Sequence, residues 1–160
     1  MTAGGFQMLL DGAWTTIWIS LIAIVCGVPI GFGLSLIRVS RVPVLSQIVV
    51  LYVSLGRATP LVTLALFLFV TLPVFGINID KYTAGVVALT LNTASFNTEV
   101  WRSAYLAFPQ SQIEAARATG MTRALYFRRI MFPQMWFAAL PSLVNEMTLL
   151  IKASPAIAVI

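Results

Sequence analysis

The sequence predicts an all-α membrane protein, a polytopic helical bundle, on two observations. Of its 160 residues, 59% are hydrophobic and 9% are charged, whereas a water-soluble domain of this length needs a more highly charged surface. The apolar residues also fall into four long runs, and a helix needs roughly 20 mostly apolar residues to cross a bilayer. Lipid is therefore the expected solvent for most of the chain.

The four predicted spans occupy about residues 13–37, 48–74, 82–106 and 133–151. No basic residue precedes the first and no small-residue cleavage site follows it, so we interpret it as a retained span. In the second, Pro60 beside Arg57 predicts either a broken helix that lines a cavity or a plain kink. Pro133 fits the first turn of the fourth, where the N–H has no intrahelical partner. We expect a fifth span beyond residue 160.

The Lys and Arg residues give these spans a direction, because cytoplasmic loops carry the excess of both. Arg38 and Arg41 follow the first span. Five more arginines lie at the end of the third span or between it and the fourth: Arg102, Arg117, Arg123, Arg128 and Arg129. We therefore expect the 38–47 and 107–132 loops to be cytoplasmic and the N-terminus to lie outside.

Two glycines in the first span, Gly27 and Gly31, are spaced for close helix packing. Small residues at this spacing let two helix backbones approach each other. The partner helix is either in the same chain or in another subunit.

Counting residues excludes several kinds of chemistry. The chain has no His and one Cys, Cys26, so we expect no metal site of those residues, no disulfide and no Cys–His nucleophile. It also lacks a G-x-x-x-x-G-K-[ST] phosphate loop, so it is not its own ATPase of that class. No catalytic residue is predicted, and the basic residues track membrane sidedness rather than a nucleic-acid surface.

The loop between the third and fourth spans contains a short, basic helical insert. Ser111 and Glu114 have the spacing of a capping box, and Gly120 suits the left-handed residue that ends a helix. Thr122 can cap a second helix that carries Arg123. The first helix is about 12 Å long, too short to cross a membrane. From physics alone, the insert is either a docking element or an ordinary solvated loop.

The spacing within this insert resembles the EAA loop of ABC importer permeases. The family pattern is Glu-Ala-Ala, three residues, Gly, nine residues, Ile, one residue and Leu-Pro, and this chain departs from it at Phe132, where Leu is usual. The matching residues are Glu114, Ala115, Ala116, Gly120, Ile130 and Pro133. In addition, Ala115 and Ala116 give the first helix a smooth face for another protein.

Other segments extend the resemblance to nearly the whole chain. The run from Arg57 to Pro60 is similar to the Arg-Gly-Thr-Pro segment of polar amino acid permeases, with Ala58 in place of Gly. Leu89 to Asn92 with Thr98–Glu99, and Asn145–Glu146, are similar to their third-span and fourth-span segments. The chain most resembles the histidine, basic amino acid and opine branch.

The resemblance implies a type I ABC importer permease fold and a permease subunit that imports polar amino acids, cationic ones included, by alternating access. It implies a separate cytoplasmic ATP-binding subunit dimer that docks on the 111–130 loop, with Arg123 among the contact residues and with ATP and Mg on that partner. It also implies a second permease subunit, identical or homologous, an extracytoplasmic solute-binding protein and a bacterial plasma membrane. The chain itself would bind no cofactor.

Charged and amide side chains inside the predicted spans are candidate functional residues, because a charge in the bilayer usually faces a partner or a water-filled cavity. We hypothesise that Asn92, Glu99, Asn145 and Glu146 line the solute pathway, where carboxylates meet an ammonium or guanidinium group. Four residues are candidates for a structural or gating role: Arg57, Thr59, Pro60 and Lys152. The alternative is structural, with Arg57 paired to Glu99 and Lys152 snorkelling to the headgroups.

Three competing functions remain open at this stage. A non-transporting assembly subunit would bind other helices through the glycine pair, and a passive channel would need no docking element. An enzyme embedded in the membrane would need a nucleophile with a base, which the composition does not supply.

Overall fold

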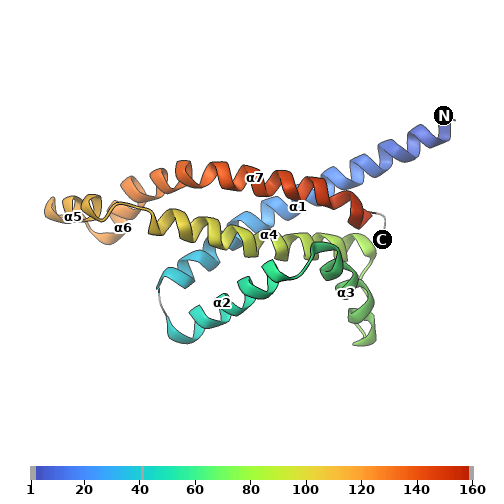
Figure 1. Ribbon diagram of the computed structural model, residues 1–160, viewed down its shortest axis with the longest axis horizontal. Coiled ribbons are helices and arrows are strands. Elements are labelled where there is room, and N and C mark those ends of the chain that lie inside the picture. Colours follow the sequence, from blue (N-terminus) through green and yellow to red (C-terminus); the bar gives the residue numbers. More distant parts are fainter. Residues whose placement is uncertain (1–2, 41, 159–160) are drawn as a thin grey trace.

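The computed structural model describes residues 3–40 and 42–158 (Figure 1). The described residues contain helices and connections but no strand, which confirms the all-α prediction. In chain order, the elements are α1 (Ala3–Ser40), α2 (Pro43–Ala58), α3 (Leu61–Val74), α4 (Lys81–Leu106), α5 (Gln110–Ala118), α6 (Arg123–Tyr126), the π-helical segment η1 (Phe127–Met131) and α7 (Phe132–Ala158).

The bundle is organised around α4, which contacts α1, α2, α3 and α7. α4 begins after Asp80, whose carboxylate accepts the backbone N–H groups of Tyr82 and Thr83 at 3.0 and 3.1 Å. Hydrogen bonds from Thr83 hold the pKa of the Asp80 carboxyl below its usual value. In Figure 1, α5 and α6 lie at one end of the molecule, and the ends of α1 and α7 nearest the chain termini lie at the other.

Small residues bring α1 against α4. A Cβ atom built on Gly27 would lie 2.8 Å from the Cβ of Thr93, and one on Gly31 would lie 2.8 Å from the Cβ of Asn97. Both distances are shorter than side chains tolerate, so only glycine allows this approach. The structure therefore supports packing within the chain as the role of this glycine pair.

Two apolar clusters hold the helices together. Near the insert, Trp101 of α4 packs with Met135 and Leu143 of α7 and with Ile113 of α5. Toward the other end, Leu89 of α4 lies in a second cluster whose members come from α1, α3, α4 and α7: Ile19, Ala23, Ala65, Ala88, Leu89, Leu150 and Ile157. The first cluster ties the insert mechanically to α4 and α7.

The predicted spans map onto these helices with different support. Among the described helices, α1 alone is long and apolar enough to cross a membrane unaided, over Gly5–Ser40, while α2 and α3 meet that criterion only as a pair. α4 and α7 have 26 and 27 residues, and at about 1.5 Å per residue they exceed a hydrocarbon core of about 30 Å. Buried polar side chains such as Asn97 and Thr98 lower the hydropathy of α4. That α4 and α7 are spans remains a prediction.

The predicted second span, 48–74, is not a continuous helix. α2 and α3 are bent by 105° where they meet, at Thr59 and Pro60. Proline lacks an N–H and disfavours the helical conformation of the residue before it, and Thr59 has an extended backbone with φ −88° and ψ 124°. Of the two alternatives at Pro60, the broken helix is therefore correct.

The start of the fourth span also differs from the prediction. Instead of a separate helix before Pro133, α6, η1 and α7 form one uninterrupted helical run, and α7 continues past Ile151 to Ala158. Within η1 the N–H of Phe132 donates to the carbonyl of Phe127, five residues back. Pro133 cannot donate to the preceding turn and its ring crowds the carbonyl there, and a wider π turn accommodates that crowding.

Candidate functional site

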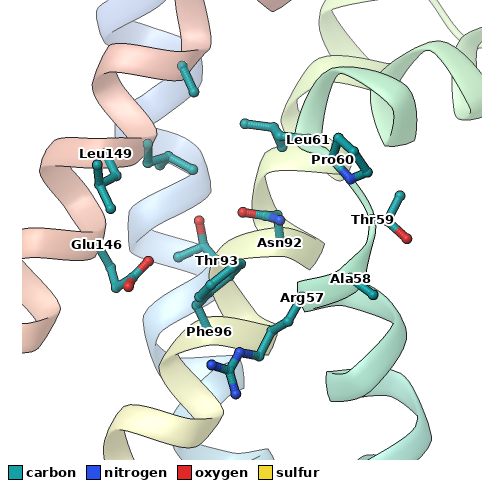
Figure 2. A pocket seen from close by; sticks show the side chains of 12 residues that line it. Arg57, Ala58, Thr59, Pro60, Leu61, Asn92, Thr93, Phe96, Glu146 and Leu149 are labelled. Carbon is teal, nitrogen blue, oxygen red and sulfur yellow. The ribbon is translucent and has the colours of Figure 1, made fainter.

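A pocket opens at the break between α2 and α3 and faces α4 and α7 (Figure 2). We call this space of about 380 Å³ the break pocket. Its polar lining residues are Arg57 and Thr59 from the break, Asn92 and Thr93 from α4 and Glu146 from α7. Of the two alternatives that the sequence left open at Pro60, the structure shows a broken helix that lines a cavity.

Arg57 and Glu146 enter this region from opposite sides, with Phe96 and Thr93 between them (Figure 2). The guanidinium carbon of Arg57 lies 5.4 Å from the centre of the Phe96 ring, a distance at which the ring face attracts a cation. The pocket thus presents a guanidinium and a carboxylate across an aromatic surface. These are complementary to the carboxylate and the ammonium of an amino acid.

Asn92 donates a hydrogen bond to a backbone carbonyl at the break. In a continuous helix the carbonyl of Gly56 would accept the N–H of residue 60, which Pro60 lacks. The Asn92 side-chain nitrogen donates to that carbonyl at 3.3 Å, and the Tyr52 hydroxyl donates to the carbonyl of Leu91 at 2.6 Å. The end of α2 is therefore fastened to α4 by two side chains.

The structural alternative, an ion pair between Arg57 and Glu99, is wrong. Glu99 pairs instead with Arg38, at the end of α1, and with Arg102, whose Nε lies 3.0 Å from a carboxylate oxygen. Arg102 lies three residues along α4 on the same face, and the close packing of α1 on α4 brings Arg38 to the carboxylate. Glu99 also lines a second pocket of about 360 Å³ together with Arg57 and Glu146.

Asn145 and Lys152 do not join this site. Both are exposed and neither lines the break pocket, whereas Glu146, Leu149 and Ala153 of the same helix do. Helical residues share a face at spacings of three, four and seven, so the residues immediately before Glu146 and Ala153 point elsewhere. The same rule could have found Phe96, four residues after Asn92, which our sequence reasoning missed.

The insert combines a buried and an exposed face. α5 ends with Gly120 at a φ of 78°, the N–H of Gly120 donates to Arg117, and that of Met121 donates to Ala116. This bond pair is a Schellman motif and confirms the role predicted for Gly120. The Thr122 cap is also confirmed, because its hydroxyl accepts the N–H of Leu125 at 3.4 Å.

Two expectations about α5 are wrong. The capping box at Ser111 does not form, because α5 begins at Gln110 after Pro109, which has no side-chain cap. Ala116 is not on the docking face, since it is 4% exposed and packs into the cluster near the insert. Glu114 and Ala115 are exposed, so the outer face of α5 is narrower than the sequence suggested.

The three remaining residues predicted for the coupling loop lie in different surroundings. Ile130 packs against the same cluster from η1, while Pro133 is exposed at the start of α7. Arg123 is exposed and lines a groove beside the end of α1.

A helical bundle with one helix long and apolar enough to span a membrane, a polar pocket at a broken helix and an exposed helical insert fits the class of membrane permease components that the sequence resembles. Comparison with known families agrees with this class. The chain belongs to the family described as binding-protein-dependent transport system inner membrane component, whose model matches residues 9–160. The family predicted from the EAA-like spacing is thereby confirmed.

Among its relatives, the chain is similar to the probable amino-acid ABC transporter permease PatM of Vibrio harveyi, with 36% identity over 92% of this chain and 67% of the relative. It is 34% identical to the octopine transport system permease OccM of Rhizobium radiobacter, over 93% of this chain and 64% of the relative. It is also 34% identical to the probable amino-acid ABC transporter permease YckA of Bacillus subtilis, over 97% of this chain and 69% of the relative. The chain thus spans about two thirds of these relatives.

Solved structures share the fold. A crystal structure of an amino acid ABC transporter with histidines aligns with a TM-score of 0.86 and 32% identity, covering 99% of this chain and 77% of the other. The MetNI methionine ABC transporter in an inward-facing conformation aligns with a TM-score of 0.74 and 26% identity, covering 97% of this chain and 73% of the other.

Proposed function

We propose that this chain is the transmembrane permease subunit of an ATP-driven importer for polar amino acids. Family membership and the permease names of its relatives support the proposal. In it the chain is a non-catalytic subunit that works by alternating access, and ATP and Mg are bound and used by a separate cytoplasmic ATPase dimer. A second permease subunit and an extracytoplasmic solute-binding protein complete the assembly in a bacterial plasma membrane.

The observation that carries this proposal is the two-sided insert. Ile113 and Ala116 are buried in the cluster that includes Trp101 of α4 and Met135 of α7, whereas Glu114 and Ala115 face solvent. Closely packed interiors transmit displacement rather than absorb it. A force applied to the exposed face of α5 by a docked ATPase would therefore move α4 and α7, which line the break pocket. In this proposal the coupling residues are Glu114, Ala115, Gly120 and Arg123, with Ala116, Ile130 and Pro133 anchoring them.

The break pocket is the proposed solute site. Glu146 would contact the ammonium or side-chain guanidinium of the solute, and Arg57 would contact its carboxylate. Asn92 would form the wall of the site near the break. The pocket shared by Glu99 and Glu146 would extend the path toward the insert. We expect Glu146→Gln to lower uptake of a cationic amino acid about tenfold, because a charge-assisted hydrogen bond is lost. Asp11→Asn, which removes a carboxylate at an exposed position of α1 outside the pocket, is the control. Equal uptake by the two variants would remove Glu146 from the site.

Docking of the ATPase is tested with a matched pair of glycines. Gly120 and Gly76 both have a positive φ, 78° and 80°, and both have open space around a built Cβ. A valine strains either position by about 1–2 kcal/mol or more, but Gly120 lies in the insert and Gly76 in the connection from α3 to α4. The full-length assembly is purified in mild detergent, and ATP hydrolysis and bound ATPase are measured.

Gly120→Val should lower the captured ATPase about tenfold, while Gly76→Val should retain it. Equal capture by both variants would place the ATPase contact outside the insert. A folded parent protein that captures no ATPase would support the assembly-subunit or channel alternatives.

A further inference from the structure

A groove lies beneath the insert, between the end of α1 and the elements α5, α6 and η1. Its volume is about 590 Å³, larger than that of the break pocket. We call it the insert groove and define it by six of its lining residues: Leu36, Val39, Tyr105, Arg117, Arg123 and Phe127. The space is thus bounded by apolar side chains of α1 and η1 and by two guanidinium groups from the insert.

No ion pair within residues 3–40 and 42–158 neutralises the two arginines of the insert groove. Among the described residues, the ion pairs are those of Glu99 with Arg38 and with Arg102, so no carboxylate pairs with Arg117 or Arg123. Residues 107–131 contain four arginines and one acidic residue, Glu114. An adjoining pocket of about 440 Å³ shares Val39 and Tyr105 with the groove and adds Arg38 and Arg102. Because those two arginines share one carboxylate, this end of the molecule has an excess of positive charge.

The position of the groove matches a membrane surface. The candidate membrane span of α1 ends at Ser40. The groove is lined by three residues from the last two turns of that helix, Leu36, Val39 and Ser40. A ligand here meets hydrocarbon-like side chains on one side and guanidinium groups on the other. Arginine binds phosphate oxygens through paired N–H groups, and basic pockets beside cytoplasmic helix ends suit anionic lipid headgroups.

We propose that the insert groove binds the phosphate headgroup of an anionic phospholipid of the cytoplasmic leaflet. Arg117 and Arg123 hold the phosphate, the Tyr105 ring closes the space from α4, and an acyl chain follows Leu36 and Val39 along α1. A lipid held there joins the end of α1 to the insert. The lipid site is separate from the proposed solute pocket, and it shares Arg123 but not Arg117 with the proposed ATPase contact.

The chain supplies a control with the same change in charge. Arg128 and Arg129 lie in η1, are exposed and do not line the insert groove. The full-length protein, with the subunits that purify with it, is prepared from vesicles of equal dioleoylphosphatidylglycerol and dioleoylphosphatidylcholine. Native mass spectrometry then counts the lipids retained by the parent, by Arg117→Gln/Arg123→Gln and by Arg128→Gln/Arg129→Gln.

The parent and the η1 variant should retain phosphatidylglycerol in preference to phosphatidylcholine. The groove variant should lose it about tenfold, on the scale of one charge-assisted contact. Single Arg117→Gln and Arg123→Gln variants repeat the measurement if the double variant does not fold, which helical circular dichroism reports. Equal loss from both double variants would show diffuse attraction to headgroups and overturn the site.

Two further outcomes separate other occupants from a lipid. If inorganic phosphate at millimolar concentration displaces the retained phosphatidylglycerol, the groove binds free phosphate and the lipid assignment is overturned. If Arg117→Gln, which leaves the proposed ATPase-contact residues unchanged, keeps its lipid but loses the ATPase, the occupant is a protein, which also overturns the lipid assignment. Because Gly120→Val tests ATPase docking independently, failure of the lipid site and failure of the proposed function are distinguishable.

Discussion

At the scale of single residues, the pairing of Asn92 with Gly56 explains how a broken helix is kept in one geometry. Pro60 removes the N–H that the Gly56 carbonyl would accept in a helix. A carbonyl left without a donor away from water costs about 1–3 kcal/mol, and Asn92 supplies the missing donor from α4. The amide therefore has a structural duty that is separate from any contact with a solute.

Asn92→Leu should lower the free energy of unfolding by about 1 kcal/mol, because it keeps the number and branching of the side-chain heavy atoms and removes the donor to Gly56. Asn145→Leu makes the same change at an exposed position of α7 and should leave stability unchanged or slightly raised. Thermal unfolding of both variants in the same detergent measures the difference. Equal midpoints for the two would mean that the long 3.3 Å contact contributes nothing to the break.

Sequence reasoning found many of the polar residues of the site but not their partners. Arg57, Asn92 and Glu146 stand out because charged and amide groups are rare in apolar runs. Thr59 was found through the resemblance of the run from Arg57 to Pro60, and all four residues line the break pocket. The partner of Glu99 could not be foreseen, since it depends on how far along α1 the glycine contacts place Arg38. Exposed positions such as Asn145 also differ from pocket positions only by their phase around the helix, and an uncertain helix boundary leaves that phase undetermined.

At the scale of helices, the α1–α4 contact depends on Gly31 more than on Gly33. A Cβ on Gly31 would lie 2.8 Å from the Cβ of Asn97 and 2.9 Å from the backbone carbonyl oxygen of Ala94, whereas one on Gly33 would meet nothing within 4 Å. We expect Gly31→Ala to destabilise the protein by about 1–3 kcal/mol through overpacking. Gly33→Ala should stabilise α1 by about 0.5–1 kcal/mol, because alanine is the better helix former. Unfolding in denaturing detergent ranks the two variants, and a tolerated Gly31→Ala would contradict the close contact.

The helix boundaries show what periodicity and propensity leave undetermined. The apolar runs located both ends of α4 and the C-terminal end of α1 to within three residues. α1 begins ten residues before its predicted start, and α7 belongs to a helical run that already begins at Arg123. The 105° bend at Thr59 and the π turn before Pro133 are both consequences of a missing proline N–H. Proline signals that some adjustment is needed, but the packing of neighbouring helices decides between a break, a kink and a widened turn.

At the scale of the whole molecule, the arrangement has two distinct ends. One end holds α5, α6 and the arginine-rich insert, and the other holds the N-terminal end of α1 and the connection from α3 to α4 (Figure 1). Positive charge favours the cytoplasmic side. The functions proposed for the insert and for the insert groove both require this end of the molecule to face the cytoplasm. The orientation of the chain is therefore the property on which these proposals jointly depend.

Orientation can be read with two cysteines in a Cys26→Ser background, because Cys26 is the only cysteine in the sequence. Asn78→Cys places a thiol in the connection from α3 to α4, and Ala118→Cys places one at the end of α5; both positions are exposed. A membrane-impermeant maleimide added to intact cells should label the first and not the second, and permeabilised cells should label both. Labelling of the Ala118 position alone would invert the topology and remove the ATPase contact from the insert. Labelling of both in intact cells would contradict the placement of the two ends on opposite sides of the membrane.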